Sequence, residues 1–343
     1  MKSMSFVILL VAGVIFSCIN KTEPATLHEN KSPSKKATTS SNSLNSYENP
    51  ETIRVNKDIP IKHYFKWMDS VVFGLNATHN YATNEYILVH NNHWILDTLS
   101  KTDYYYLKEK GIFNEDSQYL LALRKNQVLI VPDSLQTERI KSQLDNTYLD
   151  LNIPEFKMRI IQNGQALYKF PVRVGQNSTR FLAMANREVD LRTKPGVGTI
   201  IRVNKQPAFI NPKDNHRYHS TRRDDGMVTK LPAIPWIEPA INGVSLGQLI
   251  HPTTNLETLE KAYSNGCVGL RESDAWIVYY YAPVGTKVVF RYDLKGKDEA
   301  GNTVEFNNIY PGFEKLSIQK ETTETALYKI DGKPISVCYC HLE

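Results

Sequence analysis

The sequence predicts an α+β protein, mainly β, in which a β-sandwich-like unit with one main helix follows a smaller mixed unit. Two observations favour this fold class. Short runs rich in β-branched and aromatic residues recur between residues 150 and 293, with turn residues between them. An Asn-Gly pair at 163–164 separates two of these runs, which is a strong hairpin signal. Only residues 274–281 read as a clear helix in this region.

Composition divides the 343 residues into five segments. We expect a signal peptide at 1–17, a lipidated disordered tether at 18–50, a mixed N-terminal domain at 51–149, a catalytic domain at 150–293 and a C-terminal extension at 294–343. No internal repeat is evident. The length is enough for two globular units with tails.

The N-terminal segment predicts export. Residues 6–16 form an apolar run that is too short to span a bilayer and has the length of a signal-peptide core. Cys18 follows Ser17 at the end of this run and resembles the acylated cysteine of a bacterial lipoprotein. Ordinary signal cleavage nearby is the alternative. The first interpretation anchors the protein by lipid in the cell envelope, facing the periplasm of a Gram-negative bacterium.

Residues 18–50 are rich in Lys, Ser, Thr and Asn and have little to bury, so we expect a disordered tether. A coil of about thirty residues has a root-mean-square reach of roughly 30 Å and a stretched limit near 100 Å. A lipid-anchored domain on this tether could act on a polymer away from its membrane.

In the N-terminal domain, residues 127–133 read as a strand ended by proline, and Asp133 or Ser134 could cap a following helix through Leu135, Ile140 and Leu144. Its role is either to position a substrate or partner or to serve as scaffold. The apolar residues expected to supply its core, and the leucines expected to mark helices, are Trp67, Val71, Val72, Tyr86, Ile87, Leu88, Val89, Trp94, Ile95, Leu96, Leu107, Leu120, Leu121 and Leu123.

The catalytic domain is expected to consist mostly of strands. These strands are predicted at residues 159–161, 166–170, 199–203, 248–250 and 287–290, with the helix at 274–281 close behind Cys267. A nearby helix N-terminus would favour a thiolate at Cys267. Residues 294–343 add charged turns and a few strand-like pieces.

The chemistry is expected at Cys267, sixteen positions after His251 (267 minus 251). A thiolate attacks much faster than a thiol, so a catalytic cysteine needs an imidazole or a positive charge beside it. His251 could supply a base. Gly266 leaves room for a carbonyl substrate, and backbone N–H groups around Gly266 and Cys267 could receive its oxyanion.

The residues around Cys267 resemble the L,D-transpeptidases with the YkuD-type catalytic domain. That family has a histidine, a spacer of similar length and Ser-His-Gly-Cys, followed by an aliphatic residue and then Arg or Asn. Further similar stretches carry the resemblance over roughly residues 150–293: they are Arg159–Gly164, Phe170–Gly175, Thr193–Thr199, Asp274-Ala275 and Val284–Val288, besides Ser264, Gly266, Val268, Leu270 and Arg271 near the cysteine.

Three positions depart from the family pattern. Asn265 stands where the family usually has His, Gly269 where it has Arg or Asn, and Pro252 where a Gly follows the first histidine. Asn still hydrogen-bonds in both directions. Because an Arg at 269 would help to hold a substrate carboxylate or the site loop, this chain must use Arg271 or another cation, or lack that contact. Pro252 leaves its carbonyl free to orient the His251 imidazole.

The resemblance implies a peptidoglycan L,D-transpeptidase. Cys267 would cleave the bond before the terminal D-alanine of a tetrapeptide stem and transfer the acyl group to an amine of another stem. Water as acceptor would give an L,D-carboxypeptidase, and an acceptor protein, which the sequence does not identify, would give wall anchoring. A degenerate peptidoglycan-binding scaffold is a further alternative. A papain-like or NlpC-type peptidase fits less well, because those enzymes place the cysteine before the histidine.

Several residues are expected to support the site. Ser264, Gly266 and Asn265 would shape the loop or the oxyanion site, although Ser264 could instead cap the following helix. Arg271 would bind a substrate carboxylate or pair with a neighbouring acid. The cluster at 216–226 contains Arg222 and Arg223, which would form either a carboxylate-recognising lid or a solvated loop.

The sequence gives no support for a metal, an organic cofactor or nucleic-acid binding. The net charge of +5 is modest, and no tract interleaves Lys and Arg with aromatic residues. Cys338-Tyr339-Cys340-His341 is a weak metal signal without a second cluster, and a disulfide between the two cysteines would be strained. Lipidation of Cys18 would leave an odd number of cysteines, so at least one should stay free or pair outside the chain.

Overall fold

The structure is a computed structural model that describes residues 50–318, 328–330 and 333–334. The predicted signal peptide, Cys18, the tether, Cys338 and Cys340 lie outside the described residues and stay predictions. Within the described part, none of the helices has the length and apolar character needed to cross a membrane. The predicted fold class is confirmed: the described chain is mainly β, with a sandwich-like or barrel-like sheet and a few helices.

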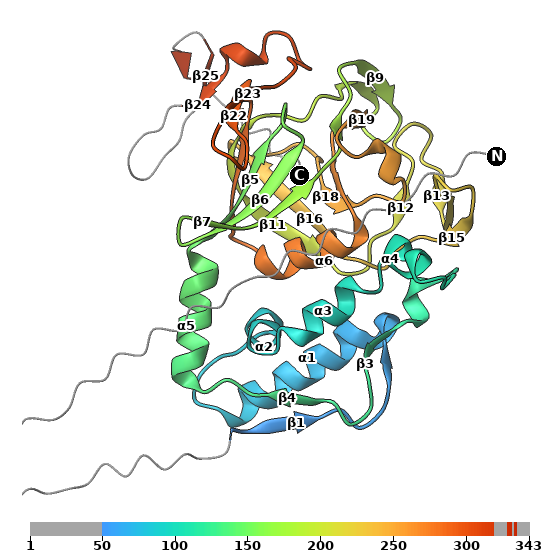
Figure 1. The fold of residues 1–343 in the computed structure, drawn as a ribbon, viewed down its shortest axis with the longest axis vertical. Helices are drawn as coiled ribbons and strands as arrows, with labels where there is room; N and C mark the ends of the chain where they lie inside the picture. Colours follow the sequence, from blue (N-terminus) through green and yellow to red (C-terminus); the bar gives the residue numbers. More distant parts are fainter. Residues whose placement is uncertain (1–49, 319–327, 331–332, 335–343) are drawn as a thin grey trace, which may run out of the picture. The chain divides into compact units, whose positions relative to one another are not determined.

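Nine strands of the described chain form the main sheet, at the top of Figure 1. The pairs β20–β18 and β21–β5 are parallel and the other neighbours are antiparallel, so the sheet is mixed. The strands, in the order in which they pair, are β20 (Val268–Leu270), β18 (Ile250–Pro252), β16 (Trp236–Ile241), β11 (Gly196–Asn204), β21 (Lys287–Arg291), β5 (Thr147–Asn152), β6 (Lys157–Gln162) and β7 (Gln165–Pro171), with β17 (Val244–Ser245) beside β16.

The chain beyond β7 pairs with the opposite end of this sheet. Arg173 and Gly269 exchange two backbone hydrogen bonds, with N···O distances of 2.9 and 3.0 Å. The same segment continues into β8 (Val174–Gly175), which runs parallel to β19 (Ala262–Ser264). The residues just before and after Cys267 are therefore held to the segment that follows β7.

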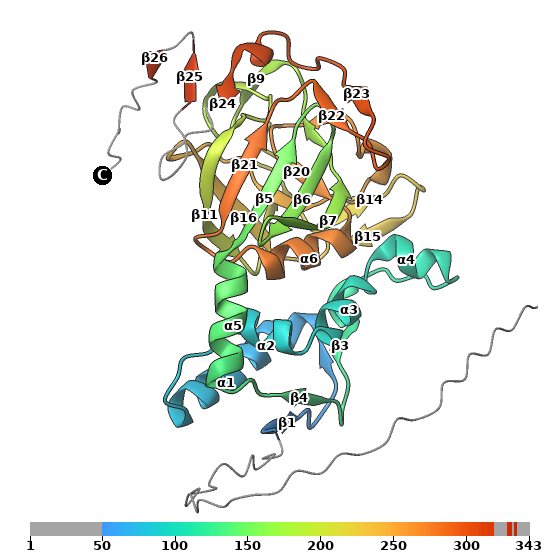
Figure 2. The same cartoon turned by 60° about the vertical axis from the view of Figure 1, so that its left-hand side comes forward.

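The helices form a second layer on one side of α6 (Figures 1 and 2). α6 is buried on nearly every side because it lies between the sheet and α1–α3, which explains its lack of a polar face. Its Tyr280 hydroxyl lies 2.6 Å from that of Tyr64 on α1, which satisfies both buried hydroxyls. The helices are α1 (Ile61–Thr78), α2 (Glu85–Asn91), α3 (Trp94–Ser100), α4 (Tyr104–Glu109), α5 (Ser134–Asp145) and α6 (Glu272–Tyr281), with short 3-10 turns η1 (Ser117–Tyr119), η2 (Leu256–Thr258) and η3 (Phe313–Lys315).

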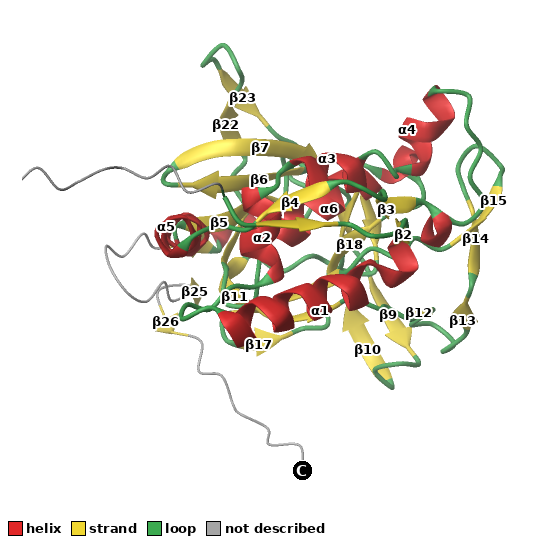
Figure 3. Ribbon diagram, turned by 90° about the horizontal axis from the view of Figure 1, so that it is seen from below, coloured by secondary structure: helices red, strands yellow, loops and turns green. Residues whose placement is uncertain are grey.

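The predicted helix through Leu135, Ile140 and Leu144 is confirmed as α5. Its Asp133 carboxylate accepts the Gln136 N–H at 2.7 Å, while the Gln136 side chain accepts the Asp133 N–H, which is a capping box. α5 leads from β4 (Val128–Ile130) in the helical layer to β5 in the main sheet, and Figure 3 shows it end-on.

The predicted helical role of the leucines near residue 120 is wrong. Leu121 and Leu123 belong to β3 (Leu121–Leu123), a strand that pairs with β2 (Ile59–Pro60), whereas Leu107 does lie on a helix. The expected core residues of this region are buried or pack against the core. One cluster of buried apolar side chains extends from Val55 to Phe313, so the segments that the sequence separates at residue 150 share it.

Short hairpins surround the main sheet. The Asn163-Gly164 turn joins β6 to β7 as predicted. The remaining strands pair as β1 (Thr52–Arg54) with β4, β9 (Thr179–Leu182) with β10 (Arg187–Asp190), β12 (Phe209–Ile210) with β13 (Arg217–Tyr218), β14 (Ser220–Arg222) with β15 (Val228–Lys230), β22 (Lys295–Lys297) with β23 (Thr303–Glu305), and β25 (Tyr328–Ile330) with both β24 (Ser317–Ile318) and β26 (Lys333–Pro334).

Candidate active site

Cys267 and His251 line one cavity of about 680 Å³. His251 lies in β18 and Cys267 immediately precedes β20, and these two strands are parallel neighbours. In their register His251 stands beside Gly269, two residues after Cys267. Since side chains two residues apart on a strand point to the same face, the pairing directs the thiol and the imidazole to one side of the sheet.

Hydrogen bonding fixes the His251 ring in the form that a base requires. Its Nδ1 lies 2.8 Å from the Pro252 carbonyl oxygen, which can only accept, so Nδ1 carries the proton. The Nε2 lone pair is then free to take a proton. This contact confirms the prediction that the Pro252 carbonyl orients the imidazole. Burial and the neighbouring Arg173 guanidinium lower the pKa of His251 to about 4, so the ring is neutral at pH 7.

Cys267 is a free, half-buried thiol. Burial raises the pKa of this thiol, while the Leu249 backbone N–H, 3.4 Å from Sγ, and the Arg173 guanidinium act in the opposite direction. Among the described residues, no hydrogen bond joins Sγ to the His251 ring. The thiol and the imidazole are therefore both neutral at rest, and transfer of the thiol proton to Nε2 would give a thiolate.

The loop before Cys267 is held by side-chain bonds to its backbone. Ser264 Oγ donates to the Cys267 carbonyl at 2.6 Å and accepts the Gly266 N–H at 3.2 Å. The Thr193 hydroxyl donates to the Gly266 carbonyl at 2.9 Å. Gly266 has a φ of 107°, a conformation that strongly favours glycine. Ser264 therefore shapes the loop and does not cap α6.

These bonds decide which amide can receive an oxyanion. The Gly266 N–H is already bound to Ser264, which corrects the expectation that it is available. The Cys267 N–H has no acceptor among the residues that the structure describes. It is the free donor next to the sulfur.

Asn265 also lines the cavity, where its side-chain oxygen accepts from Gln176 at 3.4 Å. Residues of the β9–β10 hairpin, β12 and β13 also line the cavity, and most of them are apolar. Trp236 lies against His251, with ring centroids 5.1 Å apart. The cavity thus combines a mostly apolar lining with a few polar groups, among them the thiol.

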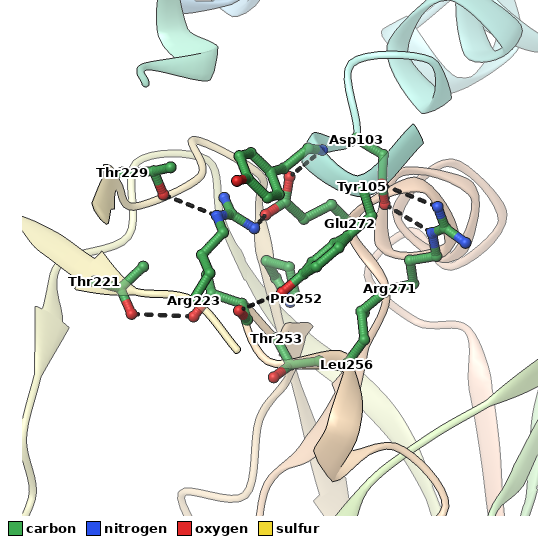
Figure 4. Close-up of polar contacts among 12 residues, drawn as sticks. Asp103, Tyr105, Thr221, Arg223, Thr229, Pro252, Thr253, Leu256, Arg271 and Glu272 are labelled. Atoms are coloured by element: carbon green, nitrogen blue, oxygen red, sulfur yellow. Dashed lines mark hydrogen bonds and ion pairs between the residues drawn. The ribbon is translucent and has the colours of Figure 1, made fainter. Parts of the chain in front are cut away.

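The predicted arginines are placed elsewhere. Arg271 lies outside the cavity and pairs with Asp103, with Nε and Oδ2 3.1 Å apart. Arg223 is also outside the cavity and forms a buried ion pair with Glu272 at 2.7 Å, as Figure 4 shows. Arg222 is exposed on β14 and does not line the cavity either. Their placement corrects the expectation that these arginines contact substrate in the site.

The N-terminus of α6 also differs from its expected role. The Ser273 N–H donates to the Asp103 carboxylate at 3.0 Å, and Glu272 lies in the first turn. Two acidic groups therefore occupy the positive end of the helix. The helix N-terminus serves to hold α4 and the β14–β15 hairpin, not the Cys267 thiol.

Residues before 150 brace the segment that follows His251. The Tyr105 hydroxyl donates to Asp224 and is also 2.9 Å from the Thr254 carbonyl. Asp224 accepts the backbone N–H groups of Leu256 and Glu257 at 2.9 and 3.2 Å. This contact favours a scaffolding role for the N-terminal region, in which it fixes the loop behind the histidine.

Sequence reasoning missed several residues of the site. Arg173 lines the cavity, and Thr193 and Gln248 tie the 192–194 turn to the Cys267 loop. Arg173 and Thr193 lie in stretches that resemble the family, but their spacing gives no sign that they meet Cys267. A charged residue inside the apolar run 170–175 was the available signal. No group of three or more His, Cys, Asp or Glu side chains among the described residues could hold a metal ion.

The cavity is lined by a thiol and an imidazole, and one known family matches this part of the chain. Residues 146–290 match the YkuD family model, which describes the L,D-transpeptidase catalytic domain. No curated protein sequence matches the chain.

Solved structures with partial similarity include three L,D-transpeptidases. One from Mycobacterium smegmatis is 14% identical, with a TM-score of 0.30 over 43% of this chain and 58% of that one. One from Xylanimonas cellulosilytica is 11% identical, with a TM-score of 0.31 over 71% and 98%. One from Enterococcus faecium is 12% identical, with a TM-score of 0.28 over 42% and 49%. The chain spans less than two thirds of the length of the mycobacterial structure.

The buried ion pair leads to a stability prediction. Arg223→Ala leaves the Glu272 carboxylate buried without its partner, so we expect a loss of about 3–5 kcal/mol in the free energy of unfolding. Arg222→Ala, at an exposed neighbouring position, should change it by less than about 0.5 kcal/mol. Urea denaturation of the two variants measures both values. Equal losses would contradict the structural role assigned to Arg223.

Proposed function

We propose that this protein is a peptidoglycan L,D-transpeptidase that works through a thioacyl intermediate on Cys267. The observation that carries the proposal is the arrangement of the Cys267 thiol, the proton-accepting His251 Nε2 and the unbound Cys267 N–H at one cavity. The family match over residues 146–290 supports the substrate class.

In the acylation step, His251 Nε2 takes the Cys267 proton and Sγ attacks the carbonyl carbon of the third residue of a tetrapeptide stem. The Cys267 N–H donates to the oxyanion of the tetrahedral intermediate. The bond to the terminal D-alanine then breaks, and the imidazolium returns the proton to the leaving amine. The products are free D-alanine and a thioester.

In the second step, an amine of a neighbouring stem attacks the thioester. His251 accepts a proton from that amine, the carbon–sulfur bond breaks, and the thiol is restored by the same proton. The result is an amide crosslink between two third-position residues. Water in place of the amine would release a tripeptide, and an amine of an acceptor protein would anchor that protein to the wall.

Muropeptide products test this function directly. The full chain incubated with disaccharide-tetrapeptide should give a crosslinked dimer that has lost D-alanine, detected by mass spectrometry. Cys267→Ala should abolish the product, and His251→Asn should lower the rate by about 10²–10⁴-fold, which is the usual contribution of an acid–base group. His63→Asn changes an exposed histidine on α1 and serves as the matched control.

The outcomes separate the alternatives. Tripeptide without dimer would indicate a carboxypeptidase. Muropeptide that binds without any product would indicate a binding scaffold and contradict the transpeptidase proposal.

The low pKa of His251 predicts that activity persists to an unusually low pH. A base is active when it is unprotonated, so activity should fall only as the pH drops through the pKa of about 4. At pH 5.5 an ordinary histidine with a pKa of about 6.5 would be only about one tenth neutral. We therefore expect kcat/KM for release of D-alanine to be nearly equal at pH 7 and pH 5.5. A half-maximal point near pH 6.5, with the far-UV circular dichroism unchanged, would contradict this account of His251.

A further inference from the structure

Arg173 is a partly buried cation at the wall of the cavity, and it has no anionic partner in the described part of the chain. Its Nε is buried and has no hydrogen-bond partner among the described residues, and Nη1 reaches only the Thr258 hydroxyl at 3.3 Å. No carboxylate of residues 50–318 forms an ion pair with it. Lys194, on the same cavity, is instead paired with Asp190.

The backbone places this guanidinium close to the nucleophile. Arg173 and Gly269 are a hydrogen-bonded antiparallel pair, so their side-chain positions share one face. A Cβ on Gly269 would lie 2.5 Å from Arg173 Nε and 2.7 Å from its Cγ. The Arg173 side chain therefore crosses the space that a side chain at position 269 would fill.

The ionisable groups around Arg173 also indicate that an anion is missing there. Burial lowers the pKa of Arg173, and the ionisable groups that act against this effect are Cys267 and Tyr263. Burial keeps the Cys267 thiol protonated, so it is not an anion at rest. A guanidinium with a buried Nε and no carboxylate partner in the described part of the chain has an unmet need for an anion, which a ligand carboxylate can satisfy in a two-point contact.

The direction of the reaction indicates which anion this is. His251, Gly269 and Arg173 lie side by side across three neighbouring segments, and Cys267 lies two residues before Gly269. In the proposed mechanism the leaving amine receives its proton from His251. The leaving residue therefore lies on the same side of the Cys267 thiol as His251 and Arg173. Its carboxylate follows the amine by one carbon atom.

We propose that Arg173 holds the free carboxylate of the leaving residue and so restricts the donor to peptides that end one residue after the scissile carbonyl. This inference rests on the proposed function. It makes Arg173 a specificity-determining residue, supplied from the segment after β7, at a site where Gly269 itself carries no side chain.

Binding to an inactive chain tests the inference without depending on turnover. In the full chain with Cys267→Ala, calorimetry compares disaccharide-tetrapeptide ending in D-alanine with the same molecule ending in D-alaninamide. The acid should bind about 10–100-fold more tightly than the amide, as expected for a charged hydrogen bond. Adding Arg173→Gln should remove this preference, whereas Arg139→Gln on the exposed face of α5 should keep it.

A substitution at position 269 tests the same inference while Arg173 stays in the chain. Gly269→Ala should weaken the preference because the new Cβ displaces the Arg173 side chain. The double substitution Arg173→Ala with Gly269→Arg moves the guanidinium to the partner position of the backbone pair. It should restore at least part of the preference for the acid over the amide. Thermal unfolding of every variant confirms that it is folded, and the Gly269→Ala result stands if Arg173→Gln does not fold.

The opposing outcomes are distinct. Equal binding of acid and amide to the Cys267→Ala chain, or a preference that survives Arg173→Gln, overturns the role of Arg173 and leaves the proposed function intact. Failure to bind either form contradicts the proposed function together with this inference. Alkylation by iodoacetamide uses Arg173→Gln in a chain that keeps Cys267. If this alkylation is slower than in the unaltered chain, and Arg173→Gln leaves the acid preference unchanged in the binding assay, the arginine stabilises the thiolate and the carboxylate contact is overturned.

Discussion

The two backbone hydrogen bonds between Arg173 and Gly269 hold the site together. They join the segment after β7 to β20, while the parallel pairing of β18 with β20 brings in His251. The Cys267 thiol, the His251 imidazole and the Arg173 guanidinium thus come from three separate segments of the chain. A side chain at position 269 would collide with Arg173, so the missing side chain is part of the geometry.

Burial around the Arg173–Gly269 pairing determines the protonation states of Cys267 and His251. Taking the thiol and the imidazole out of water favours their neutral forms, which raises the pKa of Cys267 and lowers that of His251. In the proposed mechanism, charge develops close to two backbone donors, the Leu249 N–H at 3.4 Å from Sγ and the unbound Cys267 N–H. The bracing of the following loop by Tyr105 and Asp224 explains how residues before 150 contribute to a site that they do not line.

The sequence predicted the structural features that depend on neighbouring residues in the chain. The hairpin at Asn163-Gly164, the cap at Asp133 and the strand periodicity are local signals, and the structure agrees with them. The Cys267 and His251 pair could be inferred from spacing because flanking motifs restrict it. The arginine positions could not, because they depend on distant segments: Arg271 meets Asp103 at the start of α4, whereas Arg173 meets Gly269 in β20. Pairing of the segment after β7 with β20 is a tertiary event with no local signature.

The acyl-enzyme itself is the most direct test of the account. Intact mass spectrometry of the full chain, quenched in acid shortly after mixing with disaccharide-tetrapeptide, should show an adduct equal to the donor minus D-alanine. Peptide mapping should locate this adduct on Cys267. D-alanine release without any adduct, and at the same rate in a Cys267→Ala chain, would contradict the assignment of Cys267 as the nucleophile.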